Sequence, residues 1–245
     1  MQNKQTKSEV LFLQYCALRG YVANRIPMPS DGDQFADYEV TIAQRRIIVE
    51  VKELQANSSD KNAAKIIREG RIEVFGDKPG RRIRNHIEEA EEQLRRYENE
   101  RVPCLVVFYD NIIVDRFRPY PPGGFMVDIC NPLYPYHIDV GMYGLESVQL
   151  RLHRDGPAEC VGNVRGGERT LRLGHQDNIS AVVTLHDYDP NYGLFLIVYH
   201  NFFAKNPLPT AVFAHSKDKQ LEKPGHPETS PGGWQAVQTA LGEKK

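Results

Sequence analysis

The chain has 245 residues, of which 40% are hydrophobic and 26% are charged, with a formal net charge of −1. These values are ordinary for a globular protein with ample length for a buried core, in one large domain or two small ones. The near-zero charge gives no support to nucleic-acid binding by itself, and no stretch approaches the roughly 20 apolar residues of a membrane helix.

The start of the chain and its cysteines suggest a cellular compartment. Met1–Lys7 is polar, and the apolar run after it is short and amphipathic, so nothing resembles a signal peptide. The cysteines are scattered and lack the close pairs of a zinc site, which favours free or buried thiols in a reducing environment. They are Cys16, Cys104, Cys130 and Cys160. We therefore expect a cytoplasmic protein with no membrane partner.

The first helix is predicted over Ser8–Arg19, where apolar residues recur at helical spacing and Gly20 follows as a stop. Glu9 lies near the start of this helix, where a carboxylate interacts favourably with the helix dipole. Tyr21–Ile26 has the composition of a short strand, and the turn-rich residues 27–33 lead from it to the next element.

Residues 37–51 predict a β-hairpin, which is the stretch that carries the functional argument. Asp37–Ile42 alternates polar and apolar side chains in a β-rich composition. Arg46–Val51 is an almost unbroken Ile/Val run, which suits a strand in the centre of a sheet. A short turn at Ala43 and Gln44 would join the two strands.

This register places Asp37 directly opposite Glu50, and side-chain alternation puts Glu50 and Lys52 on one face. A two-residue slip would keep all three groups on that face, whereas a one-residue slip would not. Unpaired charges beside an apolar core are costly to desolvate, and a divalent cation with carboxylate ligands would offset that cost. The alternative is a half-exposed hairpin with a surface Glu–Lys pair, because a bare D…ExK pattern is short and common.

The spacing of Asp37, twelve intervening residues and Glu50-Val-Lys52 resembles the motif of the PD-(D/E)XK nuclease superfamily, with Ala36 at the usual proline. The resemblance implies an α/β, restriction-endonuclease-like fold, in which helices flank a mixed central sheet in an αβββαβ order. It also implies that Asp37 and Glu50 bind Mg²⁺ or Mn²⁺ and that Lys52 assists the hydrolytic water. An acidic residue on the opening helix often contributes to the metal site in this superfamily, so Glu9 is a further candidate ligand.

The chain after the hairpin is unusually basic from residue 61 to residue 86, and a helix is predicted over residues 61–69. Solvated surface charge explains most such runs. Beside a metal site, however, the same groups would serve as a clamp for the phosphates of DNA. The candidate nucleic-acid-binding residues are Lys61, Lys65, Arg68, Arg81, Arg82 and Arg84.

A long amphipathic helix is predicted over Asn85–Arg101, with apolar residues at helical spacing and acidic residues one turn before basic ones. Gln93 and Tyr97 lie one turn apart on it. By themselves they are ordinary helix residues. A Gln-x-x-x-Tyr after ExK is similar to an accessory motif of several branches of the same superfamily, in which the Gln points into the site. Gln93 is therefore a candidate catalytic residue, supported by Tyr97.

Val102–Tyr109 is a continuous apolar run of buried-strand type. It completes the αβββαβ order, and its parallel pairing across the preceding helix would form a right-handed crossover. Residues 1–115 are therefore expected to contain the nuclease-like core.

Residues 116–205 predict a β-rich extension, as part of the same domain or as a small second domain. A long loop rich in Pro and Gly precedes short strands at 148–152, 161–173, 179–185 and 193–203. The pair His200–Asn201 either touches substrate, with the His as a general base, or caps its strand. Residues 206–245 are expected to be a loosely ordered tail, with Trp234 as a docking residue.

The function expected from these patterns is a metal-dependent nuclease that hydrolyses phosphodiester bonds of DNA, in defence or repair. The alternative is a catalytically silent module of the same fold that binds nucleic acid or protein. A third interpretation is a mixed α/β domain in which D…ExK is coincidental. No Walker-type loop or Gly-x-Ser-x-Gly motif supports another hydrolase. A homodimer or a partner subunit is also expected, because cutting both strands of DNA usually requires two active sites.

Overall fold

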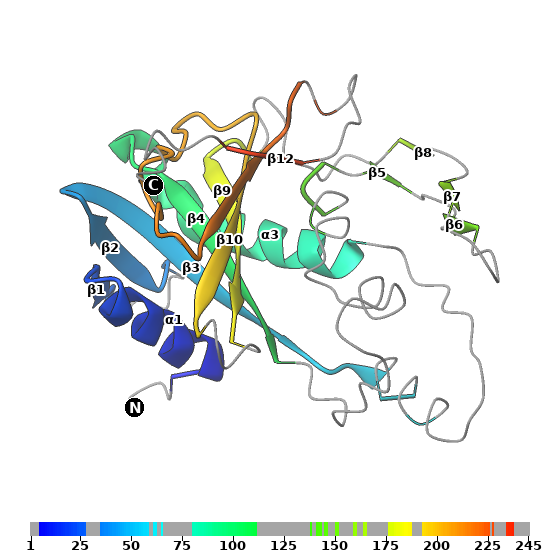
Figure 1. Ribbon diagram of the computed structural model, residues 1–245, viewed down its shortest axis with the longest axis horizontal. Helices are drawn as coiled ribbons and strands as arrows, with labels where there is room; N and C mark the ends of the chain where they lie inside the picture. The colour runs from blue at the N-terminus through cyan, green and yellow to red at the C-terminus, as the bar shows by residue number, and fades with distance from the viewer. Residues whose placement is uncertain are drawn as a thin grey trace.

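A mixed eight-stranded β-sheet forms the frame of the computed structural model, which has an α/β fold (Figure 1). The structure describes residues 5–27, 35–58, 61–62, 65, 80–111, 138, 141–143, 145–146, 150–151, 159–160, 164–165, 176–187, 193–225, 227 and 234–237. No helix within these residues is long and apolar enough to cross a membrane.

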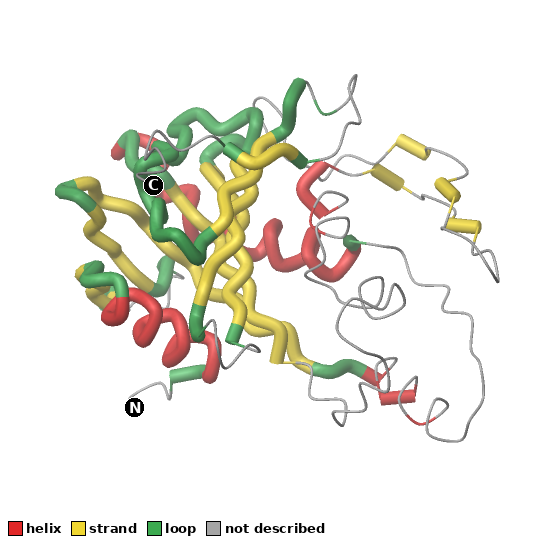
Figure 2. The backbone as a smooth tube through the Cα atoms, in the orientation of Figure 1, coloured by secondary structure: helices red, strands yellow, loops and turns green. Residues whose placement is uncertain are grey.

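The strands of the large sheet, which are among the yellow segments in Figure 2, lie in the order β1-β2-β3-β4-β9-β10-β11-β12. Two further pairs of two-residue strands, β5–β8 and β6–β7, lie outside this sheet. The strands of the large sheet are β1 (Val22–Arg25), β2 (Tyr38–Ile42), β3 (Arg45–Gln55), β4 (Cys104–Asn111), β9 (Ile179–His186), β10 (Phe195–His200), β11 (Lys219–Glu222) and β12 (Gln235–Ala236). The small pairs are β5 (Leu145–Glu146) with β8 (Val164–Arg165), and β6 (Leu150–Arg151) with β7 (Glu159–Cys160).

The predicted hairpin forms in the predicted register. β2 and β3 pair antiparallel with Tyr38 opposite Val49 and Ile42 opposite Arg45, so Asp37 and Glu50 are the next pair along. Ala43 and Gln44 form the two-residue turn, both with positive φ (48° and 64°), as a type I′ turn requires. β3 extends four residues beyond the predicted Val51, because its far half pairs with β4 along its whole length.

Helix α1 (Lys7–Leu18) begins at a capping box. The Thr6 hydroxyl accepts a hydrogen bond from the Glu9 amide, while the Glu9 carboxylate accepts one from the Thr6 amide. Both unsatisfied donors at the helix start are thereby bonded. The chain leaves the helix through Gly20, which has a φ of 70° that suits glycine.

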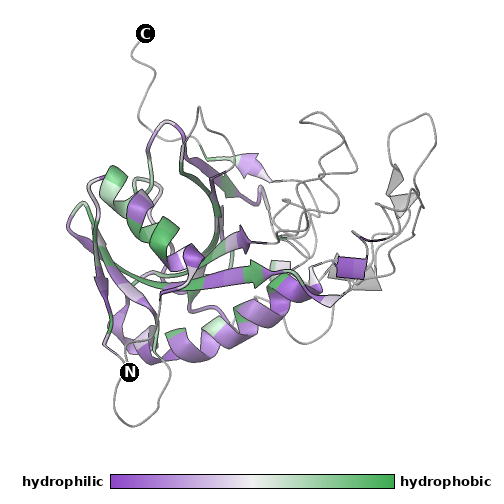
Figure 3. Ribbon diagram, turned by 90° about the horizontal axis from the view of Figure 1, so that it is seen from below, coloured by the Kyte–Doolittle hydropathy of each residue, from purple (hydrophilic) through white to green (hydrophobic). Residues whose placement is uncertain are grey.

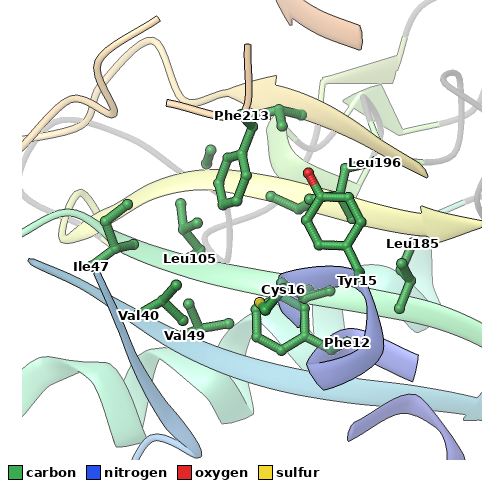
Figure 4. Close-up of a cluster of buried hydrophobic side chains, with 14 of the residues drawn as sticks. Phe12, Tyr15, Cys16, Val40, Ile47, Val49, Leu105, Leu185, Leu196 and Phe213 are labelled. Atoms are coloured by element: carbon green, nitrogen blue, oxygen red, sulfur yellow. The ribbon is translucent and has the colours of Figure 1, made fainter. Parts of the chain in front are cut away.

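The two faces of the sheet bury separate hydrophobic clusters, because side chains alternate along each strand. One face packs Ile47 and Val49 of β3 against Phe12 and Tyr15 of α1, and Phe213 closes the cluster (Figure 4). Figure 3 shows hydrophobic residues both on strands of the sheet and on the short helix beside it, whereas the longer helix is mostly hydrophilic.

The opposite face of the sheet packs against α3 (Arg81–Leu94). Ile48 and Leu54 of β3 lie in this second cluster, together with Ile83 and Ile87 of the helix. Helix α3 begins four residues earlier than predicted and ends at Leu94, where a 3₁₀-helix, η1 (Arg95–Glu100), replaces its last turns. β4 then pairs parallel with β3, as predicted.

The C-terminal half extends the same sheet. β9 pairs parallel with β4, and β10 pairs antiparallel with β9, which agrees with the strands predicted there. The loosely ordered tail expected over 206–245 differs from the structure at Lys219–Glu222, which pairs parallel with β10 as β11. The buried side chain of Gln220 explains this strand, since its amide donates to the carbonyls of Thr210 and Val212.

Three sequence predictions fall largely on residues outside those that the structure describes. They are most of the helix at 61–69, the loop after residue 115, and most of the strands at 148–152 and 161–173.

Candidate active site

The central site residues meet where β2 and β3 face α3. Glu50 and Lys52 share the side of β3 that carries Ile48 and Leu54, so both project towards the α3 face of the sheet. Asp37 lies just before β2, in the register position opposite Glu50. Gln93 comes from the last turn of α3.

Lys52 links the strand to the helix. Its ammonium nitrogen lies 3.0 Å from Glu50 Oε1 and donates a hydrogen bond of 2.9 Å to Gln93 Oε1. The Gln93 amide nitrogen in turn donates to the backbone carbonyl of Phe35, at 3.3 Å. The Lys52 side chain is 16% exposed and that of Glu50 is 3% exposed, so the lysine is the more accessible of the two.

Asp37 is fixed by both neighbouring strands. Its Oδ2 accepts a 2.8 Å hydrogen bond from the Val51 amide, and its backbone carbonyl accepts one of 2.9 Å from the Ile26 amide. The carboxylate thus bonds a backbone donor of β3 at the point where the pairing of β2 ends. Its position is set by the backbone rather than by a flexible partner.

Asp37 raises the proton affinity of Glu50, whereas the hydrogen bond with Glu50 lowers that of Asp37. Burial, followed by the charge of Asp37, raises the pKa of Glu50 to about 8 from its ordinary value of 4.5. Burial also raises the pKa of Asp37, and the hydrogen bond from Val51 opposes this effect. Because the bond between the carboxyls favours the charged form of Asp37 and the neutral form of Glu50, the shared proton belongs to Glu50.

Glu50 Oε2 is buried and has no hydrogen-bond donor. A proton held between Glu50 and Asp37, an ordered water or a cation would satisfy such an oxygen. Carboxylate oxygens are the ligands that Mg²⁺ and Mn²⁺ prefer, and Mg²⁺ commonly binds only one or two of them. The donor set of Asp37 and Glu50 therefore fits a hard divalent cation.

Glu9, the third candidate ligand, lies on the other side of the sheet, and its oxygens have partners of their own. Oε2 accepts bonds from the amide and hydroxyl of Thr6, at 2.7 and 2.9 Å. Oε1 accepts one from the Tyr38 hydroxyl at 3.2 Å and lies 3.1 Å from Arg25 Nη2. Its charge contributes to the raised pKa of Asp37. Among the described residues, no three His, Cys, Asp or Glu side chains form a group that could hold a metal.

The cationic residues occupy the end of β3 and the start of α3. Arg82 donates to the backbone carbonyl of Gln55, the last residue of β3. The first turn of α3 contains no acidic residue, and Arg81 on it is exposed while Arg84 is half-buried. Lys61 and Lys65 are exposed and helical, whereas Arg68 lies outside the described residues. The nucleic-acid-binding role of these six residues stays a prediction.

The pair His200–Asn201 has structural partners. His200 Nε2 lies 2.8 Å from Gln220 Oε1, and the Asn201 amide donates to the carbonyl of Ile179 at 2.7 Å. Asn201 Oδ1 also accepts from the Phe203 amide. These bonds support the interpretation that the pair caps β10 and ties it to β9 and β11. Trp234, the expected docking residue, lies against the Tyr199 ring with centroids 5.0 Å apart.

Sequence reasoning missed two contacts that shape this site, the carbonyl of Phe35 under Gln93 and the Val51 amide under Asp37. Both involve backbone atoms, which leave no signal in residue type. No protein-family model matches this sequence, and neither the curated proteins nor the solved structures yield a significant match to it.

Proposed function

We propose that this protein is a metal-dependent nuclease of the PD-(D/E)XK type that hydrolyses phosphodiester bonds of DNA. The observation that carries the proposal is a carboxyl pair, half-buried Asp37 and buried Glu50, in which one Glu50 oxygen has no hydrogen-bond partner and the other lies against the ammonium of Lys52. Strongly perturbed carboxyls next to a lysine are more typical of functional sites than of structural ion pairs. The order α1-β1-β2-β3-α3-β4 agrees with a restriction-endonuclease-like core.

In this proposal Asp37 and Glu50 hold Mg²⁺ or Mn²⁺. When bound, such an ion supplies a water of lowered pKa and stabilises charge on the phosphate. Glu50 gives up the proton it carries in the metal-free site, because a metal ligand must be deprotonated. Asp37 keeps its orientation through the Val51 amide while it binds.

Lys52 provides the positive charge of the site. Its ammonium is aimed by Glu50 on its own strand and by Gln93 on α3. From this position it can orient the attacking water or offset the charge that develops on the scissile phosphate. Gln93 therefore acts by holding Lys52. A role for Glu9 as a third ligand would require it to exchange the bonds of the capping box for the metal.

The proposed substrate follows from the cationic residues that come after β3 in the sequence. Exposed Lys61, Lys65 and Arg81 can contact phosphates without reading bases, which gives affinity that falls with salt. We propose a cytoplasmic role in defence or repair, with a second copy or a partner subunit where both strands are cut.

Cleavage of supercoiled plasmid and of single-stranded DNA with Mg²⁺, Mn²⁺ or EDTA tests the proposal. We expect metal-dependent nicking that Lys52→Ala reduces by at least about a hundredfold, as for loss of one group that stabilises transition-state charge. Lys219→Ala, at an exposed lysine on β11, four strands away from β3 in the sheet, is the matched control and should retain activity.

Two results would contradict the proposal. DNA binding without cleavage under every metal condition would favour the silent binding module of the same fold. Equal cleavage by wild type and by Lys52→Ala would place the activity outside this site, or in a contaminant of the preparation.

A further inference from the structure

Phe35 is held at two points, by the last turn of α3 and by the 3₁₀-helix η1 that follows it. Its backbone carbonyl accepts the hydrogen bond from the Gln93 amide, at 3.3 Å. Its ring lies under the guanidinium of Arg96, whose central carbon is 4.2 Å from the ring centroid. Gln93 and Arg96 are three residues apart, a spacing that places both side chains on one side of a helical segment.

The change from α-helix to 3₁₀-helix falls between these two residues. α3 ends at Leu94 and η1 begins at Arg95, so Gln93 belongs to the first helix and Arg96 to the second. The ring of Phe35 also packs against the hydrophobic cluster on the α3 side of the sheet. Phe35 is therefore held by a hydrogen bond to its carbonyl, by the cation over its ring and by hydrophobic packing of the ring.

The carbonyl of Phe35 fixes which way the Gln93 amide points. Its NH₂ group faces the carbonyl, so its oxygen faces Lys52 Nζ at 2.9 Å. The flipped amide would set an NH₂ group against an ammonium and a carbonyl against a carbonyl, with both hydrogen bonds lost. The orientation of the lysine thus depends on where Phe35 lies.

We propose that Arg96 is a positioning residue, which acts through the Phe35 ring and the Gln93 amide to aim the ammonium of Lys52. The inference rests on the proposed function, because it assigns to Lys52 the part of the site that meets the substrate. The contribution of Arg96 comes from its cation–π contact with the Phe35 ring, because the backbone carbonyl of Phe35 accepts the hydrogen bond from Gln93.

The test compares Arg96→Met, which keeps an apolar stem but removes the cation, with Arg95→Met as the matched control. Arg95 is exposed and pairs with Glu91, which lies one turn earlier, in α3. We expect Arg96→Met to lower kcat about two- to fivefold with KM within about twofold, the loss that corresponds to one exposed cation–π contact. Arg95→Met should match wild type in both constants.

A spectroscopic readout follows Lys52 directly. The ¹⁵Nζ NMR signal of Lys52, assigned by its loss in Lys52→Arg, reports the hydrogen bonds of the ammonium. We expect Gln93→Leu and Arg96→Met to move this signal in the same direction, and Arg95→Met to leave it in place. In a Phe35→Leu background, Arg96→Met should have no further effect, because the two changes act through one contact.

Several outcomes would overturn the inference. The signal and kcat of Arg96→Met could equal those of wild type, or its effect could be the same with and without the Phe35 ring. An unchanged Lys52 signal in Gln93→Leu would also contradict the inference, because it would show that Gln93 does not hold the ammonium. Failure of the proposed function is distinguishable, because wild type would then cleave no DNA while the Lys52 signal would still show whether Arg96 acts on it.

Discussion

Glu50 is the residue on which the electrostatics of the site depend. It is almost fully buried, one of its oxygens has no donor, and its pKa is raised to about 8. A group with these properties destabilises the metal-free fold whenever it is ionised. Such a cost is common where a site must bind an ion or react, and it is offset by the rest of the structure.

The pH dependence of metal-free stability should show this cost. Because the folded pKa of Glu50 lies above its ordinary 4.5, the folded state binds more protons between pH 4.5 and 8. Its contribution to stability therefore falls as the pH rises through that range. Glu50→Gln should unfold with a free energy about 1–3 kcal/mol higher than wild type at pH 9, and close to wild type at pH 5. Urea unfolding in EDTA measures both, and a larger difference at pH 5 than at pH 9 would contradict the assignment.

His186 should give the opposite pH dependence of stability, with a loss of unfolding free energy at acid pH. Burial lowers its pKa to about 4 from 6.5, and its Nε2 lies 2.7 Å from the Thr184 hydroxyl. The unfolded state then binds more protons between pH 6.5 and 4, so stability is lost as the pH falls through that window. His186→Gln, which keeps a polar group for Thr184, should remove up to about 3 kcal/mol of this dependence. An unchanged slope of unfolding free energy against pH would show that other groups carry the effect.

At the scale of elements, the hairpin was predictable because its evidence is local. One strand alternates polar and apolar residues, the other is an almost continuous apolar run, and only two residues separate them. These features determine the register, and the register determines which carboxylates face each other. β4 was predictable for the same reason, since its apolar pattern is continuous. The bounds of α1 were predicted to within one residue, but the face that it buries was not, because Phe12, Tyr15 and Cys16 are buried whereas Val10 and Leu18 are exposed. The early start of α3 was not predictable, because Arg81 and Arg82 have no apolar pattern and are placed by Ile83 and by the Gln55 carbonyl.

A substitution in the hairpin turn should increase the stability of the protein. Gln44 adopts a φ of 64°, a conformation that costs a side chain about 1 kcal/mol and costs glycine little. Gln44→Gly should therefore raise the unfolding free energy by up to about 1 kcal/mol, whereas the β-branched Gln44→Val should lower it. Chemical denaturation at one pH compares the two, and equal effects of Gly and Val would contradict the type I′ geometry.

At the scale of the whole molecule, the sheet joins distant parts of the sequence that local patterns could not connect. β11 is polar in sequence, and it forms because β10 offers it a parallel partner and Gln220 makes hydrogen bonds to three residues. Asp218, just before β11, accepts bonds from the Tyr15 hydroxyl of α1 and the Leu196 amide of β10. Contacts over such sequence separations have no signature in a single sequence.

Truncation after Ser216 tests whether the residues that follow form part of the folded sheet or only a loosely ordered tail. A chain that ends at Ser216 loses β11, β12 and the Asp218 contacts, so its unfolding free energy should fall by at least about 3 kcal/mol, as expected when a buried network is broken. A chain that ends at Val237 is the control and should resemble the full-length protein. Equal denaturation midpoints for all three chains would mean that the segment adds nothing to the fold.

We propose that Asp37 and Glu50 form a site for a divalent cation. The most direct test is thermal unfolding measured against Mn²⁺ concentration at pH 8. A cation that binds only the folded state stabilises it by mass action, by about 2.7 kcal/mol at a hundred times its Kd. We predict that the Tm of wild type rises with Mn²⁺ and that Asp37→Asn abolishes the rise. A wild-type Tm that does not respond to Mn²⁺ or Mg²⁺, or an equal rise in Asp37→Asn, would contradict the account.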